Sequence, residues 1–175
     1  MEKIIIYVNG KDRIGIISDI TKEISDLNGN IETSKMIKLE QDFNVLMLIS
    51  INKENIEQLT KKLYSYNDLD ILVKKTSNKN GSAKNKYIFI LKGADTEGIV
   101  HQCTQLFSKL KINITDLETQ LMNAPVTGSP LFYIKAIISI PKSESMEMIK
   151  DAINQLEVEE NVKIKFDVYN PGLNH

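Results

Sequence analysis

The sequence predicts an α+β protein built from two βαββαβ domains in tandem, each with an antiparallel sheet and both helices on one face. Two observations support this prediction. The sequence repeats itself at an offset of 83 residues, and in each half the apolar residues alternate between strand and helix spacing in one fixed order. A chain of 175 residues is long enough for two domains of the smallest stable kind.

The repeat is clearest between residues 3 and 31, where eleven residues recur 83 positions later. Several are turn formers, whose backbone roles are hard to reproduce by chance. The pairs are Lys3/Lys86, Ile5/Ile88, Gly10/Gly93, Asp12/Asp95, Gly15/Gly98, Ile16/Ile99, Thr21/Thr104, Ser25/Ser108, Leu27/Leu110, Asn30/Asn113 and Ile31/Ile114. A duplication predicts domains at residues 1–76 and 86–170. The polar segment 77–85, which lacks periodicity, is the expected linker.

The elements of the first half follow from its hydrophobic spacing. Ile4–Val8 is apolar at consecutive positions, which is typical of a buried central strand. The other elements are a helix with the stripe Ile17, Ile20, Ile24 and Leu27, strands at Ile31–Leu39 and Phe43–Ile51, a helix with the stripe Ile56, Leu59, Leu63 and Tyr66, and a strand at Ile71–Val73.

The second half repeats this order, the ferredoxin-like arrangement. Its helical stripes are Val100, Cys103, Phe107 and Leu110, then Met146, Ile149, Ile153 and Leu156, and its closing strand is Val162–Val168. Two helices cover one sheet face, so the apolar residues on the other face are expected to meet another sheet or subunit. This favours a homodimer.

Composition narrows the possible functions. Lys and Arg total 22 against 23 Asp and Glu, so no excess of positive charge suits phosphate contacts. With Cys103 alone, no intrachain disulfide can form. No apolar run approaches the roughly 20 residues of a membrane helix, and no signal segment is recognisable. We expect a cytoplasmic protein without membrane or direct nucleic-acid contact.

RNA-recognition domains share the βαββαβ order and stack bases on exposed aromatics of the central strands. The strand Phe43–Ile51 has one aromatic residue, at its edge, and no basic residue. Phe132 and Tyr133 are adjacent, so their side chains point to opposite faces. RNA binding is therefore disfavoured.

The turns Gly10–Gly15 and Gly93–Gly98, here the first and second glycine turns, are candidate ligand sites. Glycine permits sharp turns and close approach to the backbone, and a following helix start can accept a carboxylate. We expect Asp12 and Asp95 to cap these helices. Taken singly, such residues are more typical of caps and turns than of binding sites.

Asn30 and Asn113 begin the second strand of each half, where an amide offers a zwitterion both a donor and an acceptor. Branched Ile14 and Ile31 leave little space, which predicts glycine or serine as the ligand. The candidate ligand-binding residues are Gly10, Asp12, Arg13, Ile14, Gly15, Asn30 and Ile31, and Gly93, Asp95, Thr96, Glu97, Gly98, Asn113 and Ile114.

An enzyme is not expected. Glu97, His101 and Cys103 lie near one another on a helix, but Cys103 falls on the buried stripe and His101 on the surface. No phosphate-binding loop, dinucleotide fingerprint or nucleophile elbow is present, so no cofactor and no metal are predicted.

The segments Asp12–Ile20 and Leu27–Glu32 resemble the turn, first helix and second strand of the ACT domain, a family of small ligand-binding modules that regulate amino-acid metabolism. Met122–Tyr133, which leads into Ile138–Pro141, resembles tandem-ACT proteins of the glycine cleavage system transcriptional repressor type. The resemblance implies an amino-acid sensor that acts through a partner protein. No helix-turn-helix is evident, so repression would be indirect.

The second turn departs from the family pattern, since Thr96 and Glu97 replace Arg13 and Ile14. The alternative to a sensor is a protein–protein interaction module that has lost its ligand sites.

Overall fold

The computed structural model describes residues 1–76, 85–123 and 130–170. The chain divides into two compact units, Met1–Asn80 and Gly81–His175, called here the N-terminal and C-terminal units. Residues 77–84 of the expected linker lie outside the described residues, and Asn85 opens a strand. The linker boundaries therefore stay a prediction.

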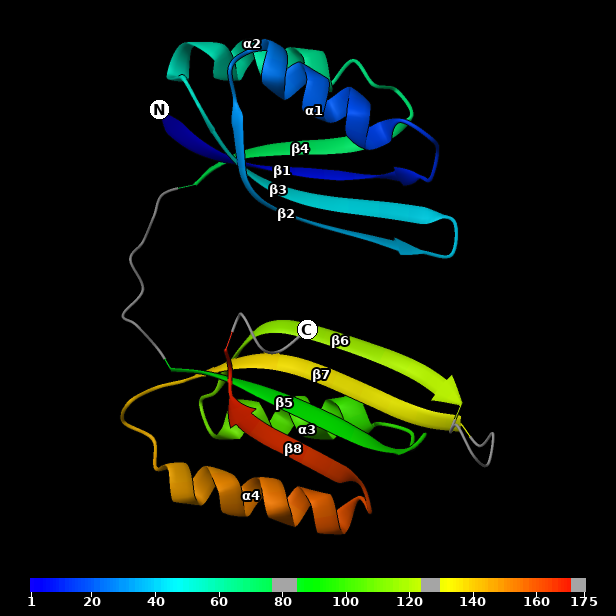
Figure 1. The fold of residues 1–175 in the computed structure, drawn as a ribbon, viewed down its shortest axis with the longest axis vertical. Coiled ribbons are helices and arrows are strands. Elements are labelled where there is room, and N and C mark those ends of the chain that lie inside the picture. The colour runs from blue at the N-terminus through cyan, green and yellow to red at the C-terminus, as the bar shows by residue number, and fades with distance from the viewer. Residues whose placement is uncertain (77–84, 124–129, 171–175) are drawn as a thin grey trace. The chain divides into compact units, whose positions relative to one another are not determined.

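The N-terminal unit contains a four-stranded sheet with its helices on one face (Figure 1). The strand order is β2-β3-β1-β4, and neighbouring strands are antiparallel. Its elements are β1 (Glu2–Lys11), α1 (Ile16–Asp26), β2 (Asn30–Leu39), β3 (Asp42–Ile51), the short helix η1 (Lys53–Asn55), α2 (Ile56–Leu63) and β4 (Leu69–Thr76).

The C-terminal unit repeats this topology, with the strand order β6-β7-β5-β8. Its elements are β5 (Asn85–Ala94), α3 (Ile99–Lys109), β6 (Asn113–Asn123), β7 (Pro130–Ile140), α4 (Met146–Glu159) and β8 (Lys163–Val168). The prediction of two ferredoxin-like domains is confirmed. Residues 124–129, which belong to the segment Met122–Tyr133, lie outside the described residues.

The duplication is visible in the element bounds. Strands β1 and β5, and helices α1 and α3, begin and end 83 residues apart. Both second strands carry the same irregularity, at Ile31/Thr33 in β2 and at Ile114/Asp116 in β6. Equivalent sequence therefore produces equivalent backbone, down to a shift in pairing register.

Each core lies between the helices and the sheet. Ile4, Ile6 and Val8 of β1 are buried beneath α1 and α2, as alternate residues of a central strand should be. Cys103 is buried in the second core, as predicted, and its pKa is raised to about 12, first by burial and then by the Glu160 carboxylate. Of the helices described, none is long and apolar enough to cross a membrane.

The sheet face of the N-terminal unit opposite the helices is apolar at its centre. Leu46, Tyr7 and Leu72 are paired across three adjacent strands. They are 42%, 38% and 44% exposed, respectively. The expectation that another sheet or subunit covers this face stays a prediction.

Gly10 and Gly93 lie inside strands β1 and β5, so their predicted role in sharp turns is wrong. Both allow close packing instead. A Cβ on Gly10 would lie 2.7 Å from Leu69 Cδ2, and one on Gly93 would lie 3.0 Å from Val162 Cβ. Leu69 is the first residue of β4, and Val162 immediately precedes β8.

Gly93→Ala should destabilise the protein by about 1–3 kcal/mol, because the added methyl group overpacks against Val162. Urea unfolding of Gly93→Ala, Val162→Ala and the double variant measures the coupling. If the losses of unfolding free energy in the two single variants add up to that of the double variant, contact between the added methyl group and Val162 is not the cause.

Candidate functional site

The first glycine turn connects β1 to α1 without a side-chain cap. Gly15 occupies the N-cap position, with φ of 97°, and no side chain accepts a hydrogen bond there. The carboxylate of Asp12 instead accepts a hydrogen bond of 2.5 Å from Lys38 Nζ of β2, and its own N–H donates to the Gln41 carbonyl. The prediction that Asp12 caps the helix is wrong. Asp12 is hydrogen-bonded to the neighbouring β2–β3 hairpin instead.

Arg13 joins the turn to two other segments. Its Nε donates to Asp68 Oδ2 at 2.6 Å, and its Nη1 donates to Asp19 Oδ2 at 2.9 Å. The hydrogen bonds that Arg13 donates to Asp68, and then to Asp19, raise the pKa of Arg13, and the guanidinium lowers the pKa of Asp68. The guanidinium is thus held beside the start of α1 by the first turn of that helix and by the loop before β4.

Arg13→Gln should raise the pKa of Asp68, because the hydrogen bond and charge that favour its carboxylate are lost. The pair's contribution to stability is present above the ordinary carboxyl pKa and is lost as pH falls through the lowered value. NMR titration of the Asp68 carboxyl carbon in both proteins checks this. Glu57, paired with Lys61, is the internal control and should titrate unchanged.

Ile14, expected to limit ligand size, is fully exposed, at 101%. It therefore does not narrow a pocket within this unit, and its role in limiting ligand size stays a prediction. The first N–H groups of α1 have no intrahelical acceptor and receive no side-chain cap. Together with Arg13, they form a small anion-accepting surface at the end of β1.

The second glycine turn has the same backbone and the opposite charge. Gly98 is the N-cap of α3, again with positive φ and no side-chain cap, so Asp95 does not cap its helix either. Asp95 and Glu97 are exposed and have no ion-pair partner among the residues that the structure describes. The Thr96 hydroxyl donates to the Ala94 carbonyl at 3.4 Å, and the Thr96 carbonyl accepts from the Ile99 N–H at 3.3 Å. This turn is therefore negative and poorly suited to a carboxylate.

Asn30 and Ile31 lie far from the first glycine turn within their unit. Asn30 is paired with Ser50 and Gly10 with Phe43, so seven residues of β3 separate them, roughly 23 Å at the rise of a strand. Strands β1 and β2 are both antiparallel to β3. The start of β2 therefore lies at the opposite end of the sheet from the end of β1.

The C-terminal unit shows the same separation, since Asn113 is paired with Ser139 and Gly93 with Phe132. Ile31 and Ile114 pack against the two cores. Within each unit, the predicted residues of the turn and of the second strand therefore do not form one pocket. The predicted residues form two groups at opposite ends of each sheet.

The sequence argument did not identify Lys38, Asp19 and Asp68, which hold the first turn in place. Asp19 could have been found as an acidic residue in the first turn of a helix that follows Arg13. Asp68 could have been found from the topology, because the βαββαβ order places the start of the last strand beside the end of the first. Lys38 could not have been found, because its contact with Asp12 depends on the register of the β2–β3 hairpin, which the sequence does not determine.

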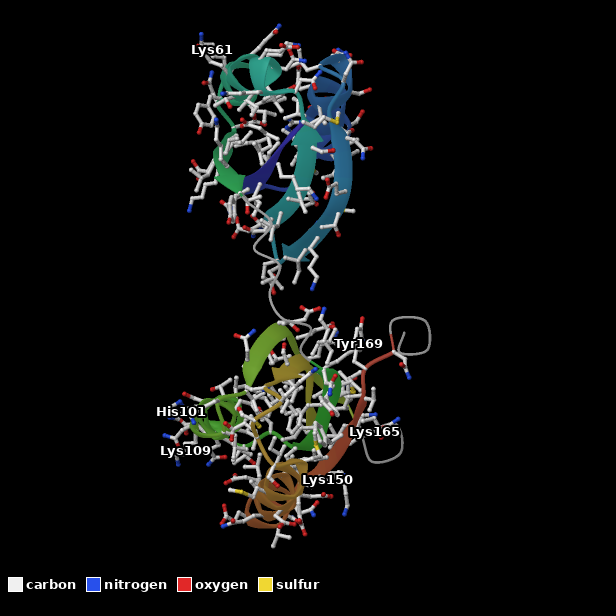
Figure 2. The ribbon with its side chains drawn as sticks, turned by 90° about the vertical axis from the view of Figure 1, so that its left-hand side faces the viewer. Lys61, His101, Lys109, Lys150, Lys165 and Tyr169 are labelled. Atoms are coloured by element: carbon white, nitrogen blue, oxygen red, sulfur yellow. The ribbon has the colours of Figure 1, made fainter. Side chains whose placement is uncertain are left out.

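His101 is exposed on α3, in agreement with the surface position expected of it (Figure 2). Over residues 1–76, 85–123 and 130–170, no group of three or more His, Cys, Asp and Glu side chains could hold a metal ion.

Gly98→Ala should cost about 1–2 kcal/mol through backbone strain alone, since φ is 85° and a Cβ there would meet no atom within 4 Å. Gly98→Asn should cost less, because asparagine tolerates the left-handed region. Urea unfolding compares the two. Equal losses would point away from φ as the cause. The same constraint at Gly15 means that Gly15→Val would strain the fold as well as the ligand site.

Residues 2–74, nearly the whole N-terminal unit, match the ACT domain family, and the C-terminal unit repeats the same topology. The chain is therefore similar to ACT-domain proteins over its first unit, and its second unit shares the fold.

It is similar to the glycine cleavage system transcriptional repressor of Escherichia coli K12, with 26% identity over 171 residues, 95% of this chain and 90% of the relative. The repressor of Shigella flexneri matches to the same extent. Among solved structures, an unknown protein from Galdieria sulphuraria superposes with a TM-score of 0.85 and 27% identity, over 97% of this chain and 99% of that one. A structure assigned as a glycine cleavage system transcriptional repressor shares the fold, with a TM-score of 0.67 and 20% identity over 97% and 98% of the chains.

Proposed function

We propose that this chain is a regulatory amino-acid sensor that controls a transcriptional or metabolic partner protein in response to a small amino acid such as glycine or serine. The similarity to a glycine cleavage system transcriptional repressor runs through both units and supports this role. No step of the proposal requires catalysis, a cofactor or direct contact with nucleic acid.

The observation that carries the proposal is the uncapped start of α1 beside Arg13. A ligand carboxylate there accepts hydrogen bonds from the first N–H groups of the helix and faces the guanidinium. The carboxylates of Asp12 and Asp68 border the same turn and suit the ligand ammonium. A small amino acid presents both groups within a few ångströms.

The second glycine turn lacks these properties. Asp95 and Glu97 would repel a carboxylate, and threonine replaces the arginine. We infer that the first turn binds the amino acid and that the second does not bind the same ligand. This division of roles follows from charge, because the two backbones are alike.

We further propose that the chain acts as a homodimer in contact with its regulated partner. The exposed row of Leu46, Tyr7 and Leu72 supports this, because a contiguous apolar surface on a sheet marks a contact site. Sedimentation of the purified protein measures the assembly directly.

Glycine and serine should raise the melting temperature, while phenylalanine should not. A ligand that binds only the folded state adds about 2.7 kcal/mol of stability at a hundredfold excess over Kd.

Asp12→Ala should weaken binding about tenfold, through loss of a charged partner for the ammonium. Asp95→Ala, the same change in the second turn, is the matched control and should bind as the parent does. Calorimetry measures the affinities, and thermal melting separates them from lost stability.

Asn30→Ala tests whether the site extends beyond the first turn, since Asn30 lies roughly 23 Å from that turn in its own unit. Unchanged affinity would confine the site to the turn. Weaker affinity would mean that the ligand also contacts the start of a second strand from elsewhere in the assembly.

The second candidate function is an interaction module without a ligand. It is favoured by the fact that Arg13 is already paired with two carboxylates, which a ligand would have to compete with. Failure of any common amino acid to shift the melting temperature at millimolar concentration would select this alternative over the sensor.

A further inference from the structure

Between the two helices of the C-terminal unit lies a half-open cavity of about 320 Å³, at the lower end of the range for small-molecule sites. Its inner surface is aliphatic and comprises Leu106 of α3 with Ala152 and Leu156 of α4. Its rim is polar and carries Gln102, Gln105, Lys109, Gln155, Glu159 and Glu160. A ligand with an apolar body and a charged end would complement such a lining.

The N-terminal unit shows why this cavity is open. There, Lys62 Nζ of α2 lies 2.5 Å from Glu23 Oε2 of α1, and this partly buried pair joins the helices. Helices α2 and α4 can be aligned by their buried residues, which pairs Leu59 with Ile149 and Leu63 with Ile153. Leu106 then replaces Glu23, and Ala152 replaces Lys62. Two shorter apolar side chains stand where an ion pair fills the groove in the other unit.

One end of the cavity is rich in hydrogen-bond acceptors. Gln102 Oε1 is buried without a hydrogen-bond partner in the described part of the chain. Helix α4 is 14 residues long against 8 in α2, and its end supplies Glu159 and Glu160. Glu160, which has no ion-pair partner among the described residues, lines the cavity together with Gln102, and its carboxylate raises the pKa of Cys103 of α3, after burial.

The other end of the cavity carries a cation. Lys109 lies seven residues after Gln102 on α3, two helical turns or about 10 Å away, and Figure 2 shows it on the same helix as His101. It forms no ion pair with any described residue. The cavity thus has hydrogen-bond acceptors at one end, a cationic donor at the other and an aliphatic surface between them.

We propose that this cavity binds a small aliphatic ligand with a primary ammonium group at one end, held by Gln102 and Glu160, and an anionic group at the other, beside Lys109. The amide of Gln102 rotates easily about its terminal torsion, so its oxygen can turn to the ammonium. Glu160 supplies the opposite charge, and the partial negative charge at the end of α4 adds to it. This site is separate from the first glycine turn.

The probe is 5-aminopentanoate, titrated into the ¹⁵N-labelled full chain and followed by amide chemical shifts. Saturable shifts should appear in α3 and α4 and not at residues 10–15. Pentanoate lacks the ammonium and should bind at least about tenfold more weakly, as should pentylamine, which lacks the carboxylate. Glycine titrated separately reports on the first turn, so failure of one site is distinguishable from failure of the other.

Three variants test the assignment. Glu160→Gln should weaken binding by about tenfold or more, whereas Glu147→Gln removes the same charge from an exposed position of α4 outside the cavity and should change nothing. Leu106→Glu with Ala152→Lys recreates the ion pair of the N-terminal unit and should block the cavity. Amide spectra verify that each variant is folded.

Binding that persists in the double variant would overturn the proposal. So would the absence of saturable shifts with 5-aminopentanoate, or shifts confined to residues outside α3 and α4. If pentylamine binds as tightly as the probe, the contribution assigned to Lys109 is wrong.

Discussion

Both units depend on a central strand that is hydrogen-bonded along both edges. Strand β1 is paired with β3 and β4, and β5 is paired with β7 and β8. Alternate residues of β1, among them Ile4 and Ile6, anchor the helices to the sheet. The same pairing brings the start of the last strand against Gly10 or Gly93, where any Cβ would collide. The position of each glycine turn is therefore set by the core.

Duplication has preserved the backbone and changed the charges. In the N-terminal unit, the charged side chains of the first turn and of the helix groove are paired internally, through Arg13 and through Glu23. At the corresponding places the C-terminal unit has carboxylates that form no ion pair with any residue the structure describes, and an aliphatic cavity. Backbone geometry survives such changes because it rests on buried apolar contacts, whereas exposed ion pairs contribute little to stability. Two alike units can thus offer different ligand chemistry.

In the proposed ligand site, the first turn is organised before any ligand binds. Arg13 is not part of a regular element, yet two carboxylates from distant segments fix its guanidinium. A side chain held in this way loses less conformational entropy when a ligand arrives than a free arginine would. The cost is competition, since the ligand carboxylate must approach a cation that already has two partners.

The sequence by itself determined the order of the elements, the duplication and the identity of the cores, because these depend on the spacing of apolar residues and on repeated turn formers. It also placed Cys103 in the interior and His101 on the surface. It did not determine which polar residues meet. Asn30 and Gly10 were both predicted to bind the ligand, but two strands that are both antiparallel to a third put them at opposite ends of the sheet. Likewise, Asp12 was expected to cap a helix, yet the register of the β2–β3 hairpin gives it Lys38. Such contacts are set by strand order and register, which only the tertiary structure decides.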